Sequence, residues 1–187
     1  CISPKQIEMM ISSKNNGFGN GIYVSIPRIK QPIELFVVFR ALGIISDKDI
    51  CNRIILDIED KDSQDVVKRL QASIIDGNKY MTQEEAMEHI TTHAAYTPLN
   101  MDKETGIRKK QEFAREVLKS DLFPHCKTQD QKIYLLGYMA KKLIRTSLGL
   151  FKEDDRDSYV NKRIELTGTL LNNLFRNYFN KLVKEMQ

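Results

Sequence analysis

The sequence contains no tryptophan and only three cysteines, Cys1, Cys51 and Cys126. The cysteines are far apart, odd in number and without a Cys-x-x-Cys pair, which argues against a disulfide framework and a zinc knuckle. No apolar run approaches the roughly 20 residues that span a bilayer, and the start of the chain lacks the apolar core of a signal peptide. A protein of a reducing compartment with no membrane partner is the simplest interpretation.

The chain also has little excess charge, because 29 Lys and Arg residues face 25 Asp and Glu residues, for a net charge of +4. Such a balance permits contact with nucleic acid without requiring it, so any contact would depend on a local basic patch. Apolar residues make up 41% of the 187-residue chain, enough for one domain, alone or with a projecting element, to bury a core. Since the chain begins at Cys1 and ends within a helical pattern, we expect it to be cut from a longer polypeptide.

The N-terminal part of the chain mixes one short helical pattern with extended segments. Residues 5–13 are predicted to form a short helix, and the glycine-rich run Asn15–Gly21 a turn between extended segments. This run is not followed by the Lys-Ser/Thr of a phosphate-binding loop. Tyr23–Ile29 and Ile33–Phe39 are rich in β-branched and aromatic residues and are predicted to be strands.

Beyond this part, amphipathic patterns predict helices. Ser46 with Asp49 and Thr82 with Glu85 resemble capping pairs at helix starts. Thr97–Gly106 is predicted to be the main internal loop, because its breakers interrupt any periodicity. The expected helices cover residues 50–56, 63–77, 83–93, 108–119, 129–148 and 170–186, and in 129–148 the apolar pattern includes Ile133, Leu136 and Tyr138. The fold class is therefore α+β, mostly helical, with a small antiparallel sheet near the N-terminal part.

The acidic cluster of Asp154, Asp155 and Asp157 around Arg156 is the main candidate for chemistry. Clustered carboxylates can hold the Mg²⁺ that neutralises charge in phosphoryl transfer. Acidic runs ahead of a helix are more often solvated faces or partners of the helix dipole, and Arg156 would neutralise part of the cluster. A structural role is favoured, and a Mg²⁺-dependent nuclease or phosphotransferase is the alternative.

Two patterns that contain histidine are weaker candidates for chemistry than the acidic cluster. His89 and His93 are four residues apart on a predicted helix, a step at which two imidazoles can share a metal, but no third ligand stands out nearby. His125 and Cys126 are adjacent, and adjacent side chains rarely face one another as base and nucleophile. Neither pattern predicts a catalytic or metal site.

Basic residues on predicted helices form the more useful candidate surface. Lys and Arg beside a phosphate backbone release counterions and bind DNA without reading its sequence. The alternatives are a solvated helix face and a helical protein-interaction module whose basic faces never meet DNA. The candidates for contact with the DNA backbone are Arg108, Lys109, Lys110, Lys141, Lys142 and Arg145.

Several motifs occur in an order that resembles a known family. They are Phe39-Arg40-Ala41-Leu42-Gly43-Ile44-Ile45, Phe123-Pro124-His125, Leu135-Leu136-Gly137-Tyr138-Met139 and the stretch 153–179. Together they resemble the lobe domain of the second-largest subunit of eukaryotic-type multisubunit DNA-directed RNA polymerases, over nearly the entire chain. Val160 and Thr169 depart from the Gly and Pro that are common in the family.

The resemblance implies a non-catalytic part of a nucleotidyltransferase, inactive on its own. It would form part of the wall of the DNA cleft in transcription, beside downstream duplex DNA. It would also be a docking platform for polymerase subunits, including the largest subunit and a small zinc-bearing subunit, and for initiation factors such as TFIIF. No cofactor is expected in this chain, and Mg²⁺ and zinc would belong to the parent assembly.

The resemblance also implies that residues 153–187 form the return junction and helix toward a neighbouring protrusion domain. The apolar face of the last helix would then be exposed in the isolated chain, where we expect it to cause self-association. Frequent Lys, Ile and Asn residues suggest an AT-rich genome, such as that of a large DNA virus. The expected location is the nucleus for a cellular source, and the virion or host cytoplasm for a viral one. The junction residues are Asp154, Asp155, Arg156, Asp157, Asn161, Lys162 and Arg163.

Overall fold

The computed structural model describes residues 5–56, 63–97 and 102–186. It contains two compact units, Cys1–Phe151, here called the body, and Lys152–Gln187, here called the C-terminal unit. The described residues are mostly helical, with a three-stranded antiparallel sheet in the order β1-β2-β3 near the N-terminus, so the predicted fold class is confirmed. No helix in these ranges is both long and apolar enough to cross a membrane.

The sheet begins with a hairpin of β1 (Glu8–Asn15) and β2 (Asn20–Ser25). In its turn, the Asn15 side chain accepts hydrogen bonds from the backbone N–H groups of Gly17, at 2.8 Å, and Gly19, at 3.2 Å. Gly17 has a φ of 96°, which glycine adopts without steric cost. The predicted turn between extended segments is confirmed.

The predicted helix over residues 5–13 is wrong, because this segment contributes most of β1. Met9 and Ile11 pack against the core, whereas Glu8 and Met10, which alternate with them, face solvent. This alternation has the period of two that characterises a strand with one buried face.

The predicted strand over Ile33–Phe39 is also largely wrong. Only β3 (Ile33–Glu34) is a strand, and α1 (Leu35–Ala41) begins at the next residue. All residues of α1 are buried, and Arg40 is the only one that is not apolar, so no helical period is visible in its sequence. The other predicted strand, Tyr23–Ile29, is confirmed only as far as Ser25, where β2 ends.

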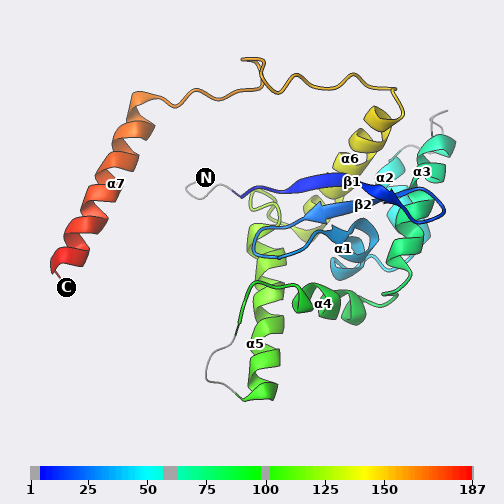
Figure 1. The fold of residues 1–187 in the computed structure, drawn as a ribbon, viewed down its shortest axis with the longest axis horizontal. Coiled ribbons are helices and arrows are strands. Elements are labelled where there is room, and N and C mark those ends of the chain that lie inside the picture. The colour runs from blue at the N-terminus through cyan, green and yellow to red at the C-terminus, as the bar shows by residue number, and fades with distance from the viewer. Residues whose placement is uncertain (1–4, 57–62, 98–101, 187) are drawn as a thin grey trace. The chain divides into compact units, whose positions relative to one another are not determined.

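In the body (Figure 1), α1 packs against α2 (Asp47–Ile55), α3 (Ser63–Gly77) and α4 (Gln83–Thr92). Outside these, α5 (Lys103–Glu116) packs against α4, and α6 (Gln129–Ser147) packs against α2 and α3. A π-helical turn, η1 (Val117–Asp121), follows α5 directly. The predicted helices are thus confirmed, with α5 starting at Lys103 rather than Arg108. The predicted loop Thr97–Gly106 is wrong from Lys103 on, where α5 begins, and its residues 98–101 lie outside the described residues.

Capping residues define where two of these helices begin. Thr82 with Glu85 forms the predicted capping box of α4, and Thr128 with Gln131 forms another at α6. Hydrogen bonds from the backbone N–H groups of Thr82 and Met81 lower the pKa of Glu85. Ser46 precedes α2, but its side chain makes no capping hydrogen bond.

A buried arginine links three elements of the body. Arg40 of α1 is 0% exposed. Its guanidinium donates to the carbonyl oxygens of Gly77, the last residue of α3, and of Tyr80, and it pairs with Asp47 at the start of α2. A buried charge is tolerated here because it is both paired and hydrogen-bonded. The motif Phe39–Ile45 therefore supplies apolar residues of the core and a buried arginine that connects α1 to neighbouring elements.

The contact of α6 with α2 requires a glycine. A Cβ atom at Gly137 would lie 2.4 Å from the backbone carbonyl oxygen of Arg53. No side chain fits in that space, so Gly137 allows the two helix backbones to approach closely.

The C-terminal unit contains α7 (Thr167–Met186), as predicted, and none of the α7 residues is buried. Its rings Phe175 and Phe179 stack with centroids 5.7 Å apart. Large apolar side chains at steps of three and four form its exposed apolar face, which consists of Leu170, Leu171, Leu174, Phe175, Tyr178, Phe179, Leu182 and Met186.

Candidate functional site

The C-terminal half of α6 carries a basic surface with aromatic neighbours, here called the α6 groove. It is a depression of about 380 Å³. Arg145 lies over the ring of Phe151, 4.6 Å from its centroid, and the Lys141 ammonium donates to the Ile55 carbonyl oxygen at 2.6 Å. These contacts hold cationic groups beside aromatic rings. The groove is lined by Leu56, Tyr134, Tyr138, Lys141, Lys142, Arg145 and Phe151.

The other predicted basic residues lie on the N-terminal half of α5. Arg108 pairs with Glu112 at 4.0 Å, and Lys110 donates to the Thr92 carbonyl oxygen at 3.1 Å. Figure 1 shows the first turns of α5 and the last turns of α6 at opposite ends of the body. The predicted candidates therefore form two separate basic surfaces, with Arg108, Lys109 and Lys110 on one and Lys141, Lys142 and Arg145 on the other.

The aromatic part of the α6 groove was not predicted. The sequence pattern groups Tyr138 with the apolar residues of its helix, yet Tyr138 is 50% exposed and Tyr134 is 55% exposed. The four-residue step between these tyrosines is a usable signal, because it places both rings on the face that leads to Lys141 and Arg145.

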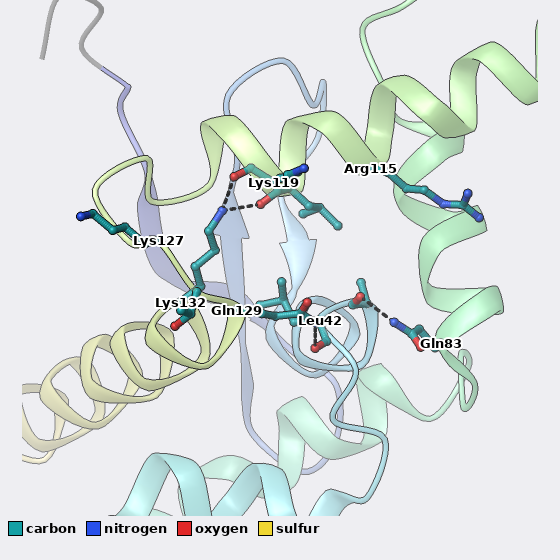
Figure 2. A pocket seen from close by; sticks show the side chains of 10 residues that line it. Leu42, Gln83, Arg115, Lys119, Lys127, Gln129 and Lys132 are labelled. Carbon is teal, nitrogen blue, oxygen red and sulfur yellow. Dashed lines mark hydrogen bonds between the residues drawn. The ribbon is translucent and has the colours of Figure 1, made fainter.

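A second depression, of about 350 Å³, lies between η1 and the start of α6 (Figure 2). We call it the basic pocket, because its lining includes Arg115, Lys119, Lys127 and Lys132 and no acidic residue. These cations come from separate elements and have no regular spacing. Sequence reasoning missed them because only the fold brings them together.

Lys132 is the most enclosed cation of the basic pocket. It is 5% exposed, and its ammonium donates to the carbonyl oxygens of Leu118, at 2.8 Å, and Lys119, at 2.5 Å (Figure 2). Burial lowers the pKa of Lys132, and the nearby Cys126 and Asp121 side chains oppose this effect. The ammonium is thereby fixed against the end of η1.

Side-chain amides satisfy backbone carbonyl groups at the base of the same pocket. The Gln83 amide donates to the Ala41 carbonyl oxygen at 3.2 Å, and the Gln129 amide donates to that of Leu42 (Figure 2). The last carbonyls of α1 are therefore paired. Arg115, Lys119 and Lys127 are left as the exposed polar groups with a positive charge.

The predicted junction residues form an exposed turn in the C-terminal unit. The Asp155 side chain accepts from the backbone N–H of Asp157 at 2.9 Å, and the Asp155 carbonyl accepts from the Asn161 amide at 2.7 Å. Asp157 pairs with Lys162 at 3.3 Å and with Arg156 at 3.9 Å. Within the ranges that the structure describes, no three His, Cys, Asp or Glu side chains gather to hold a metal ion. The cluster thus offers no support for the nuclease alternative, and its junction role stays a prediction.

The histidine pair of α4 is part of a packed cluster. The rings of His89 and His93 meet edge to face at 4.9 Å, and Tyr80 lies 4.1 Å from His89. His89 Nε2 is 3.2 Å from the Glu34 carboxylate of β3. Burial lowers the pKa of His89, the Glu34 carboxylate opposes this effect and the charge on His93 adds to it. The arrangement anchors α4 to β3.

Comparison with known proteins relates this chain to transcription enzymes. Residues 6–165 match the family described as RNA polymerase Rpb2, domain 2. The DNA-directed RNA polymerase II subunit RPB2 of Encephalitozoon cuniculi is 36% identical over 165 residues, which cover 86% of this chain and 14% of that protein. Subunit 2 of the Arabidopsis thaliana enzyme is 34% identical over 182 residues, 94% of this chain and 14% of that protein.

An archaeal protein is similar as well. The DNA-directed RNA polymerase subunit Rpo2N of Methanococcus vannielii is 34% identical over 171 residues, 88% of this chain and 32% of that protein. This chain therefore spans between 14% and 32% of the length of these three relatives.

Proposed function

The chain belongs to the family of domain 2, the lobe, of the second-largest RNA polymerase subunit, and we propose that in the complete enzyme it forms part of the DNA cleft wall and docks other proteins. It supplies no catalytic group to this activity. Nucleotide transfer, with its Mg²⁺, and the zinc of a small subunit belong to other parts of the assembly. The chain acts by positioning duplex DNA and partner proteins.

The α6 groove is the observation that carries the DNA-facing role. Lys142 and Arg145 provide charge for phosphate contact, and phosphate contacts position a duplex without reading its sequence. The basic residues of α5, centred on Lys109, provide a second surface of the same kind. Because the two surfaces lie at opposite ends of the body, one of them faces the downstream duplex and the other is a solvated helix face.

The docking role extends to the C-terminal unit. In this proposal residues 153–187 lead toward the neighbouring protrusion domain, and the apolar face of α7 packs there. The docked proteins include the largest subunit, a small zinc-bearing subunit and initiation factors. No described residue of the C-terminal unit covers the apolar face of α7, which supports this role because such a face is normally buried.

The cellular location of the assembly depends on the kind of organism that encodes this chain. The polymerase II relatives support the nucleus for a cellular eukaryotic source. A large DNA virus, which the frequent Lys, Ile and Asn residues favour, would place the assembly in the virion or host cytoplasm.

Photo-crosslinking in the assembled polymerase tests the DNA-facing role. A photoreactive residue at Tyr138 samples the α6 groove, one at Lys109 samples the α5 surface, and one at Lys68 on α3 is the control. We expect one of the first two positions, and not Lys68, to crosslink to downstream duplex DNA. Failure of both positions in an actively transcribing complex would contradict the proposal.

The isolated chain is expected to lack nucleotidyl transfer and nuclease activity. Incubation with Mg²⁺, a primed template and nucleotides tests this, with Asp155→Ala as the control for adventitious activity. An activity of the chain that needs Mg²⁺ and is lost in Asp155→Ala would restore the nuclease alternative.

A further inference from the structure

The basic pocket adjoins a second depression of the body. A neighbouring depression of about 570 Å³ lies along α4 and α5, and it shares Ala41, Gln83 and Arg115 with the basic pocket. Its own lining adds Glu84 and Glu88 of α4. Since the two depressions have three lining residues in common, they adjoin one another, and we call the pair the charge-split groove.

The charges in this groove are not used within the body. In the described residues, Arg115, Lys119 and Lys127 form no ion pair, and the same holds for Glu84 and Glu88. Figure 2 shows Arg115 extending toward the side of Gln83, whereas Lys127 lies on the opposite side of the basic pocket. The groove therefore has a positive end, a negative end and an arginine where its two parts meet.

This polarity argues against a nucleic-acid ligand. Phosphates would be repelled by Glu84 and Glu88, and no aromatic ring lines either part of the groove for a base to stack on. Leu42, Leu118 and Met87 add apolar contact area beside the polar groups. A lining with positive, negative and apolar side chains is complementary to a polypeptide that carries acidic, basic and apolar side chains.

We propose that the charge-split groove binds an extended peptide segment of a partner protein. Acidic side chains of this segment lie toward Lys119 and Lys127, and basic side chains lie toward Glu84 and Glu88. This inference rests on the docking role proposed above, and it adds a surface and a ligand chemistry to that role. Because exposed ion pairs contribute little affinity each, the charges mainly set the direction and register of the peptide.

Peptide binding to the 187-residue chain tests this inference. The probe is a fluorescent peptide with a glutamate block, an Ala-Leu spacer and a lysine block, synthesised in both chain directions. We expect one direction to bind more tightly, as measured by fluorescence anisotropy at low salt. Lys119→Glu with Lys127→Glu should weaken that binding about tenfold, since two favourable pairs become repulsive.

The negative end is tested in the same way. Glu84→Lys with Glu88→Lys should also weaken binding about tenfold. Combining both double substitutions exchanges the ends of the groove, and the preferred direction of the peptide should then reverse. Lys48→Glu with Lys68→Glu, at exposed positions outside the groove, changes net charge as the Lys119 and Lys127 variant does and should leave binding unchanged.

Several results would overturn the inference. One is an absence of binding in both directions by a chain whose circular dichroism shows that it is folded. Another is an equal loss of binding in the Lys48 and Lys68 control. A third is that duplex DNA displaces the peptide from the parent chain but does not bind the Lys119→Glu with Lys127→Glu variant. That result would identify a phosphate site instead. None of these results bears on the DNA-facing role, which depends on the α6 and α5 surfaces.

Discussion

Arg40 shows how one side chain can connect several elements. Its guanidinium is fully buried, and its partners are the carbonyl oxygens of Gly77, at the end of α3, and Tyr80, and the Asp47 carboxylate of α2. Removing the guanidinium leaves the Gly77 carbonyl oxygen buried without its donor, which costs more than the hydrogen bond itself contributes, whereas the Asp47 side chain is 33% exposed and can be hydrated. The stability of the body therefore depends strongly on this residue.

Replacing Arg40 with methionine keeps much of the volume but removes the charge and the hydrogen bonds. We expect the free energy of unfolding to fall by about 1–3 kcal/mol, because the Gly77 carbonyl oxygen is left buried without a donor. Urea unfolding followed by circular dichroism measures this change. The control is Arg53→Ala at an exposed position of α2, where a change within about 0.5 kcal/mol is expected. Equal stabilities of the two variants would contradict this account of Arg40.

His89 predicts a pH dependence of stability. Its pKa in the folded chain is lowered, mainly by burial, so the unfolded chain binds more protons at mildly acidic pH. This contribution to stability is fully present above the ordinary pKa of about 6.5 and is lost as the pH falls toward the folded value. Urea unfolding at a series of pH values below about 6.5 should therefore show that His89→Gln loses less free energy of unfolding than the parent chain.

Two further variants refine the histidine test. Glu34→Gln should make the loss of stability steeper, because the Glu34 carboxylate is what favours the protonated ring. His125→Gln, at an exposed position, should leave the parent behaviour unchanged. A parent chain that becomes more stable as the pH falls from about 7 to about 5 would contradict the assigned direction.

At the scale of elements, the junction of α2 and α6 is set by Gly137. Alanine is the better helix former by about 1 kcal/mol, yet a Cβ atom here would meet the Arg53 carbonyl oxygen at 2.4 Å. The backbone of α2 has to move, so we expect Gly137→Ala to destabilise the chain by about 1–3 kcal/mol. The matched control is Gly168→Ala in α7, where a Cβ atom meets nothing within 4 Å. Thermal unfolding of both variants measures the difference.

The elements also show what sequence can and cannot predict. Helix α4 was predictable because Thr82 and Glu85 are a complete local signal for its start. Helix α1 was not, because burial on all sides removes the polar positions that reveal a helical period. Strand β1 was misread because Met10, exposed at the sheet edge, resembles part of an apolar helical face. Local sequence signals are therefore enough to predict a capped amphipathic helix. They fail for segments whose secondary structure depends on burial in the folded chain.

The apolar face of α7 predicts self-association of the isolated chain. Exposed leucine and phenylalanine side chains at helical spacing lower their free energy by packing against a second copy. Sedimentation velocity should show dimers or larger species, and Phe175→Glu with Phe179→Glu should make the chain monomeric. The control, Asn173→Glu with Asn177→Glu, adds the same charge away from the apolar face and should leave the chain self-associated. A strictly monomeric parent chain with Phe175 and Phe179 buried internally would count against this prediction.

At the scale of the whole molecule, the candidate site was only partly predictable. Lys141, Lys142 and Arg145 are close in sequence on one helix, so their grouping could be read directly. Phe151 joins them only because the chain turns back after α6, and the charge-split groove combines residues from α1, α4, α5 and α6. The fold, and not the spacing of residues, creates that groove.

DNA binding across a salt series tests the central claim most directly. We expect the isolated chain to bind a generic duplex weakly and without sequence preference, with an affinity that falls as salt increases. If the α6 groove is the DNA-facing surface, Lys142→Glu with Arg145→Glu should reduce the slope of log K against log salt by about 0.9 for each phosphate that these side chains no longer neutralise. The control, Lys48→Glu with Lys68→Glu, changes net charge equally and should keep the parent slope. No binding at low salt, or tight binding to one sequence, would contradict the cleft-wall role.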